Sequence, residues 1–123
     1  MLGKAKLVAF AATTDVARAK SFYEDVLGLE LVEETPFALV FDANGTMLRV
    51  TPVPKLVVAP YTVLGWDVKD ITATVRALNK AGVKCERYPG MEQDKLGIWT
   101  SPSGAQIAWF KDPDGNTLSV TEF

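Results

Sequence analysis

Residues 45–51 have the sequence GTMLRVT, and a closely similar stretch, GNTLSVT, occupies residues 115–121. Both stretches begin in a turn, since residues 42–45 read DANG and residues 112–116 read DPDGN. Such turns use Gly to supply a positive φ and Asp, Asn or Pro to set the neighbouring geometry. Each stretch then continues as a strand rich in Thr, Val and Leu. The sequence therefore predicts that the chain contains an internal duplication.

The duplication extends toward the start of each half. Val8 stands seven residues before Asp15, and Val63 stands seven residues before Asp70. Both aspartates precede stretches with apolar residues three and four positions apart, so each is predicted to cap a helix. The two halves thus share the order strand, helix, and then further strands.

The helices are predicted over residues 16–27 and 71–81, each followed by a glycine at the position where helices commonly end. The period-2 pattern and the turn residues predict the strands. These strands cover residues 6–11, 29–33, 37–42, 46–51, 61–68, 83–88, 97–100, 105–110 and 117–122. The polar stretch 89–97 is interpreted as a surface loop rather than a lid.

Three prolines, Pro52, Pro54 and Pro60, mark an extended connector between the halves. We therefore predict an α+β fold of two β-α-β-β-β modules, residues 1–54 and 55–123. Modules of this size are close to the lower limit for independent folding. We expect them to form a single domain over residues 1–123.

The composition excludes several kinds of function. The chain has 123 residues, 48% hydrophobic, with a net charge of -2 and no histidine. Imidazole-based catalysis and His-based metal sites are therefore excluded. The charge pattern does not favour nucleic-acid binding, and no apolar run reaches the roughly 18 residues of a membrane span. A single cysteine, Cys85, fits a reducing cytoplasmic location and is interpreted as structural.

The duplicated order, the segment FYEDVLGL at residues 22–29 and the DPDGN turn resemble the vicinal oxygen chelate superfamily. That superfamily includes glyoxalase I, extradiol dioxygenases and bleomycin-resistance proteins. The resemblance implies a curved mixed sheet around a cavity, with the helices on the outer face. It also implies a homodimer. The quoted motifs describe the scaffold, so function must be argued from the site.

The resemblance also indicates where metal-dependent members carry their ligands. Those positions correspond to Val8, Arg49, Val63 and Ser119 in this chain. Two valines, a guanidinium and a hydroxyl do not suit a divalent metal. We therefore expect no metal and no cofactor, and no typical glyoxalase or dioxygenase activity.

Side chains alternate along strands, so these four positions also identify the residues that face the expected cavity. Leu48, Val50, Leu118 and Val120 have the opposite parity and are predicted to pack against the helices. The candidate ligand-binding residues are Arg49, Tyr61, Phe10, Asp67, Trp99, Trp109 and Ser119. None of them is assigned a catalytic role.

Arg49 allows two interpretations. It could anchor an acidic or carbonyl-bearing ligand, because its planar donor fork suits a carboxylate. It could instead form an internal ion pair with Asp67 or Glu122, or extend to solvent. Trp66 is predicted to lie in the core. The sequence does not fix the register of the strands that carry Trp99 and Trp109, so either side chain could lie in the core or line the cavity.

Three functions fit these observations. The first is a metal-free protein that binds a small organic molecule, aromatic or anionic, and sequesters an antibiotic or an aromatic metabolite. The second is a metal-independent isomerase or lyase that uses Tyr61, Asp67 or a glutamate for proton transfer. The third is a dimerisation module without a ligand. We favour the first because it requires no general base.

Overall fold

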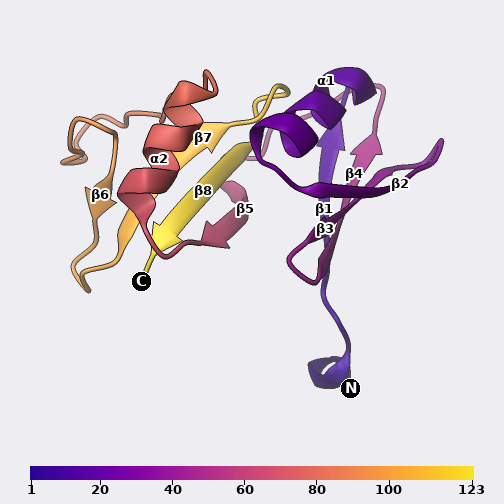
Figure 1. Ribbon diagram of the computed structural model, residues 1–123, viewed down its shortest axis with the longest axis horizontal. Coiled ribbons are helices and arrows are strands. Elements are labelled where there is room, and N and C mark those ends of the chain that lie inside the picture. The colour runs from indigo at the N-terminus through magenta and orange to yellow at the C-terminus, as the bar shows by residue number, and fades with distance from the viewer. The chain divides into compact units, whose positions relative to one another are not determined.

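The computed structural model describes residues 1–123 and divides the chain into two compact units, Met1–Val57 and Val58–Phe123. Each unit is a β-α-β-β-β module with a mixed four-stranded sheet and a helix (Figure 1). The predicted α+β class and the duplicated module are therefore confirmed. Whether residues 1–123 behave as one domain, with modules 1–54 and 55–123, stays a prediction.

In the first unit the strand order is β1-β4-β3-β2, with β1 parallel to β4 and the other pairs antiparallel. A short N-terminal turn precedes the sheet. The elements are η1 (Leu2–Lys4), β1 (Val8–Thr13), α1 (Val16–Lys20), η2 (Ser21–Val26), β2 (Glu30–Glu34), β3 (Leu39–Ala43) and β4 (Thr46–Pro52).

The predicted helix over 16–27 begins as expected but changes character after one turn. The Asp15 carboxylate caps it by accepting a hydrogen bond from the Arg18 backbone N–H over 3.1 Å. From Ser21 the helix widens to a π-helix, and the Leu27 N–H bonds to the Phe22 carbonyl five residues earlier. The expectation of a regular α-helix throughout was therefore wrong, because apolar spacing alone does not distinguish these two hydrogen-bond patterns.

The helical face of the first sheet forms a core. Leu48 and Val50 of β4 are buried, as predicted from their parity. Tyr23 from η2 is fully buried and packs its ring 5.8 Å from that of Phe41 in β3. Burying a large aromatic or aliphatic side chain contributes about 1.5–3 kcal/mol, so this side of the sheet stabilises the unit.

In the second unit the strand order is β5-β8-β7-β6, with β5 parallel to β8. Figure 1 shows α2 lying against this sheet, and it contacts β7 and β8. The elements are β5 (Thr62–Asp67), α2 (Ile71–Lys80), β6 (Trp99–Thr100), β7 (Gln106–Lys111) and β8 (Thr117–Glu122).

Helix α2 has the amphipathic pattern that the sequence predicts. Ile71, Val75 and Leu78 are buried on one stripe. At its N-terminus the Asp70 carboxylate accepts a hydrogen bond from the Ala73 N–H, and the Glu122 carboxylate accepts one from the Ile71 N–H over 3.0 Å. Two carboxylates thus satisfy backbone donors that the first turn leaves unpaired.

The predicted strand over residues 83–88 does not form. Its single backbone bond to the sheet joins the Glu86 N–H to the Trp109 carbonyl over 2.7 Å. The Gln93 side chain hydrogen-bonds to other backbone groups of this region. It accepts from the Tyr88 N–H and donates to the Glu86 and Gly97 carbonyls, each over 2.8 Å. A side chain therefore replaces the backbone ladder, and the edge strand of the module is β6 instead.

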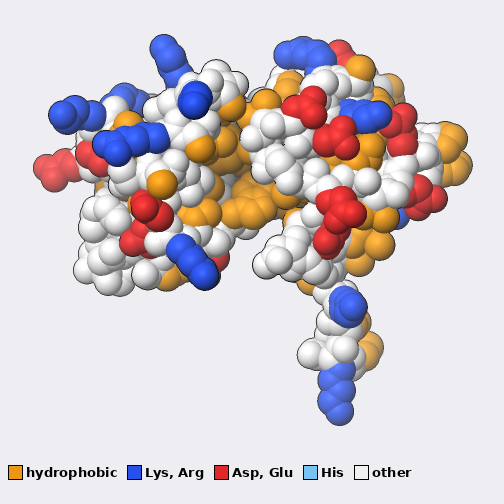
Figure 2. Space-filling view, in the orientation of Figure 1, with side chains coloured by type: hydrophobic (Ala, Val, Ile, Leu, Met, Phe, Trp, Pro, Cys, Tyr) orange, Lys and Arg blue, Asp and Glu red, His pale blue; other side chains and the backbone are white.

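Charged side chains of both signs are interspersed on both units in the view of Figure 2. An ion pair joins Lys20 to Glu34 over 3.3 Å on the surface. Neither helix is long and apolar enough to cross a membrane.

Candidate functional site

The face of the first sheet opposite its helix carries the residues predicted to line a cavity. Phe10 lies directly opposite Arg49 across β1 and β4, and Val8 lies opposite Met47. Phe10 is 61% exposed, in contrast to the buried Leu48 and Val50 on the helical face. The predicted alternation therefore holds in this unit, and Phe10 and Arg49 share one open face.

Within the first unit the Arg49 guanidinium forms no ion pair. Its polar contact is a weak one, from Nη1 to the Met47 sulfur over 3.9 Å. Glu122, one of its candidate partners, instead holds the Ile71 N–H. That carboxylate satisfies a backbone donor that the first turn of α2 leaves unpaired. Whether it also pairs with Arg49, which belongs to the other unit, stays a prediction. Asp67, the other candidate, is exposed at the end of β5 in the second unit.

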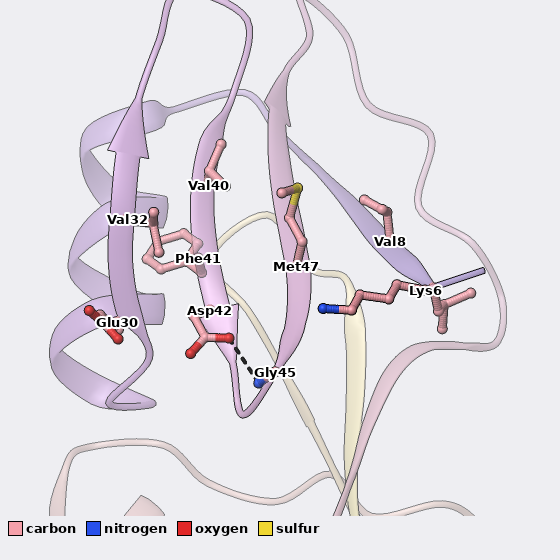
Figure 3. A pocket seen from close by; sticks show the side chains of 10 residues that line it. Lys6, Val8, Glu30, Val32, Val40, Phe41, Asp42, Gly45 and Met47 are labelled. Carbon is pink, nitrogen blue, oxygen red and sulfur yellow. Dashed lines mark hydrogen bonds between the residues drawn. The ribbon is translucent and has the colours of Figure 1, made fainter. Parts of the chain in front are cut away.

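A hollow of about 480 Å³ lies on the open side of the first sheet (Figure 3). Val8, Val32 and Met47 supply apolar walls, and the carboxylates of Glu30 and Asp42 stand on directly paired positions of β2 and β3. Asp42 is held by the Gly45 N–H over 2.8 Å. Lys6 also lines the hollow, so the lining as a whole has a formal charge of -1.

In the second unit the strand pairing settles the register of the two tryptophans. Trp109 lies opposite Ser119, which in turn lies opposite Gly65. A Cβ added to Gly65 would stand 2.9 Å from Ser119 Oγ, so these residues share one face. Trp99 lies opposite Ile107, two residues before Trp109, and therefore faces the same side. Both tryptophans lie on the open face, away from α2.

Trp66 lies on the other face of this sheet. Trp66 pairs with Val120, and Val120 is buried on the helical face. The Trp66 side chain itself stays partly exposed. The prediction of the helical side for Trp66 agrees with this register.

The open-face tryptophans form an aromatic cluster with Tyr88. The ring centroids of Trp99 and Trp109 are 6.1 Å apart, and the Tyr88 ring stands edge-on to Trp109 at 5.6 Å. Burial raises the pKa of the Tyr88 hydroxyl, and the nearby Glu86 carboxylate adds to the effect. Tyr88 is therefore a neutral hydrogen-bonding group at physiological pH.

A second hollow, of about 500 Å³, lies beside this cluster within the second unit. Tyr61 and Trp109 line it, as two of the candidate ligand-binding residues. Tyr88, Met91 and Lys111 also line it, and the sequence interpretation did not identify them as site residues. Lys111 could have been identified from its position two residues after Trp109. This spacing places both side chains on one face of the strand once the register is known.

A β-bulge near the start of β5 changes the parity there. Thr62 pairs with Thr117, and the next pair is Leu64 with Leu118, so Val63 falls in the irregular step. The simple alternation that placed Val63 with Tyr61 on the open face does not apply across the bulge. Tyr61 nevertheless reaches the hollow, which Thr62 and the preceding connector also line.

The candidate residues therefore fall into two groups. Phe10 and Arg49 lie together in the first unit, whereas Tyr61, Trp99, Trp109 and Ser119 share the open side of the second. Asp67 lies opposite Thr121 at the end of β5, outside the lining of the hollow.

The residues at the four family ligand positions do not fit a divalent metal. Val8 and Val63 offer no donor atom, and the Arg49 guanidinium repels cations. No three Asp, Glu or Cys side chains of residues 1–123 lie close enough together to form a metal site. Cys85 is half-buried, and burial raises the pKa of its thiol, with Asp94 and Glu86 adding to the shift. Its thiol is therefore a poor nucleophile at neutral pH.

Comparisons with known proteins place this geometry in a family. The chain superposes on lactoylglutathione lyase from Agrobacterium tumefaciens with a TM-score of 0.77 and 18% identity, covering 99% of this chain and 96% of that one. It superposes on a glyoxalase family protein from Enterococcus faecalis with a TM-score of 0.72 and 21% identity, covering 99% and 100%. A bleomycin-binding protein in complex with bleomycin matches with a TM-score of 0.73 and 18% identity, covering 96% and 98%.

At these identities the superpositions establish the fold alone. No curated protein matches the sequence significantly. The sequence profile of the Glyoxalase/Bleomycin resistance protein/Dioxygenase superfamily matches residues 7–120, which include both modules. The chain therefore belongs to the glyoxalase/bleomycin resistance protein/dioxygenase superfamily.

Proposed function

We propose that this protein binds a small organic molecule without a metal and sequesters it, rather than transforming it. The observation that carries the proposal is the hollow of about 500 Å³ in the second unit, lined by Tyr61, Tyr88 and Trp109. Small-molecule sites have volumes of about 300–1,000 Å³ and combine apolar and aromatic walls with a few polar groups.

The chemistry of the candidate residues supports binding over catalysis. The chain contains no imidazole, and the side chains of Tyr61 and Asp67 are both exposed. A catalytic acid or base is ordinarily tuned by burial or by a neighbouring charge. Aromatic walls with isolated polar groups hold a ligand by stacking and hydrogen bonds, which suits an aromatic antibiotic or metabolite.

Arg49 provides a separate positive group, on the open face of the first sheet. Within the first unit its guanidinium has no carboxylate partner, so it can meet an anionic or carbonyl group of a ligand. Phe10 beside it offers an exposed aromatic surface. This pair supports the preference for a planar or acidic ligand.

A homodimer is part of the proposal. Val8, Phe10, Val32 and Met47 leave an exposed apolar surface on the first sheet, and monomers rarely expose large contiguous apolar patches. A second copy of this chain would cover that apolar surface, so we expect a dimer. Sedimentation equilibrium should give twice the 13.4 kDa mass of one chain.

Titration of the purified protein with aromatic antibiotics and aromatic acids, followed by tryptophan emission, tests the proposal. Saturable quenching is expected, and it should weaken in Tyr61→Ala, which removes part of the aromatic wall of the hollow. The matched control is Phe37→Ala, an exposed aromatic residue that lines neither hollow. No response across the panel would contradict ligand binding. Elemental analysis after dialysis is expected to show no stoichiometric metal, and a retained transition metal would contradict the metal-free proposal.

A further inference from the structure

We propose that the hollow of the second unit takes a planar aromatic carboxylate, with Lys111 binding the carboxylate group. This inference rests on the proposed function and specifies the class of ligand. It also moves the main anionic contact from Arg49, the residue indicated by the sequence, to a lysine that the sequence interpretation did not identify.

The polar groups around this hollow are complementary to an anion. Its ten lining residues include the Lys111 ammonium, the hydroxyls of Thr62 and Thr117 and two tyrosines, but no carboxylate. A bound anion would therefore meet donors without a competing negative group in the wall. A cationic ligand would meet the ammonium with no compensating charge.

A hydrogen bond positions the Lys111 ammonium, but no carboxylate neutralises its charge. Its Nζ donates to Thr117 Oγ1 over 2.6 Å, and it takes part in no ion pair. An ammonium has three N–H donors, so two remain for a ligand. Thr117 is 7% exposed, and its hydroxyl accepts from Lys111, which leaves the hydroxyl hydrogen to donate. Lys111 and Thr117 thus present a small cluster of donors whose directions are already partly fixed.

The rest of the wall suits a flat ring. Tyr88 stands edge-on to Trp109, so the two rings present different surfaces to the hollow. Tyr61, which is 66% exposed, and the thioether of Met91 complete an aromatic and polarisable lining. Aromatic pairs and sulfur contacts favour a planar aromatic body over a compact polar one.

The wall is also held in place. Val58 of the connector packs beside the DPDGN turn, since a Cβ at Gly115 would stand 3.6 Å from its Cγ2. On the other side, Gln93 fixes the segment that carries Tyr88 and Met91 by three hydrogen bonds of 2.8 Å. A site whose wall is already ordered loses less conformational entropy when a ligand binds.

The hollow of the first unit provides an internal contrast. There Glu30 and Asp42 outnumber the single Lys6, so its charge disfavours a carboxylate. Lys6 and Lys111 are therefore a matched pair for mutation, because each is a lysine that lines one hollow. Only Lys111 faces a wall without carboxylates.

Calorimetric titration with 2-naphthoate and its neutral counterpart, 2-naphthalenemethanol, tests the inference. The wild-type protein is expected to bind naphthoate at least about tenfold more tightly than the alcohol, because Lys111 would form a charge-assisted hydrogen bond to the carboxylate. Lys111→Met should remove this preference and leave the affinity for the alcohol nearly unchanged. Lys111→Arg should restore part of it, and Lys6→Met should leave both affinities at the wild-type values.

Three results would overturn the inference in different ways. If both compounds bind equally well and Lys111→Met changes neither, the hollow binds aromatic molecules without selecting anions, and the proposed function stands alone. If Lys111→Met weakens both compounds equally while circular dichroism shows a folded protein, Lys111 acts through packing only. If neither compound binds and the antibiotic panel also gives no quenching, the proposed function itself fails.

Discussion

The Lys111 ammonium and the Thr117 hydroxyl, on directly paired positions of β7 and β8, are joined by a hydrogen bond of 2.6 Å. Thr117 is buried and Lys111 is half-buried, so the bond lies partly shielded from water. Hydrogen bonds to charged groups are stronger than neutral ones, and their loss leaves a polar group without its partner.

Thr117→Val should therefore destabilise the protein by about 1–2 kcal/mol, because valine has the same shape but cannot accept from Lys111. Thr117→Ser keeps the acceptor and should cost less. Urea unfolding measures both, and the same Thr117→Val change made in a Lys111→Met background should cost little. An equal cost in the two backgrounds would show that the hydroxyl stabilises the fold without Lys111.

Gln93 connects three backbone groups of the segment that replaces the predicted strand. Gln93→Ala should destabilise the protein by about 2–3 kcal/mol, since each intramolecular hydrogen bond contributes about 0.5–1.5 kcal/mol. Amide exchange at Tyr88 should accelerate in parallel. The neighbouring exposed Glu92 is the control, and a loss in Glu92→Ala as large as that in Gln93→Ala would contradict this role.

Gly97 and Gly90 both have positive φ, at 88° and 83°, but only Gly97 is crowded. A Cβ at Gly97 would lie 2.9 Å from the Cys85 Cβ, whereas one at Gly90 would meet nothing within 4 Å. We expect Gly90→Ala to cost about 1 kcal/mol and Gly97→Ala about 2–4 kcal/mol in thermal or urea unfolding. Because the clash is with Cβ, adding Cys85→Ala should not relieve it. Equal costs at the two glycines would contradict a steric contribution from Cys85.

The Cys85 thiol should react with iodoacetamide more slowly than an exposed thiol at the same pH, because burial raises its pKa in the folded protein. Since the unfolded pKa is lower, the unfolded state ionises first as the pH rises. The stability that Cys85 contributes is therefore present below the unfolded pKa and is lost as the pH rises through the folded pKa.

Unfolding measured between about pH 8 and pH 11 should show a larger loss of stability in the wild type than in Cys85→Ser, since Tyr88, whose pKa is also raised by burial, contributes to both proteins. The rate of alkylation against pH supplies the second measurement. A reaction midpoint below the ordinary thiol pKa would instead identify Cys85 as an activated nucleophile.

Much of the fold follows from local features of the sequence. The repeated strand at 45–51 and 115–121, the capping residues Asp15 and Asp70, and the glycines that follow the helices predicted two modules, and the structure contains both. These features act over a few residues, so pattern and chemistry are enough to identify them. The π-helix from Ser21 and the absent strand at 83–88 depend on hydrogen-bond choices that hydrophobic spacing does not encode.

The site was less predictable for a related reason. Trp99 and Trp109 lie on strands whose register depends on pairing across the sheet, so spacing alone left their faces undecided. Lys111 could be recognised only after Trp109 was placed opposite Ser119. Glu122 could have paired with either a guanidinium or a helix N-terminus, and its bond to Ile71 depends on the position of α2.

The indole N–H resonances of Trp66, Trp99 and Trp109 in a ¹H–¹⁵N correlation spectrum test the central claim most directly. Trp109 lines the hollow and Trp99 lies beside it, whereas Trp66 is on the opposite face of the same sheet. On addition of 2-naphthoate, the Trp109 resonance should shift most, Trp99 should shift less, and Trp66 should stay in place. Unchanged positions of all three, or a shift confined to Trp66, would contradict binding in this hollow.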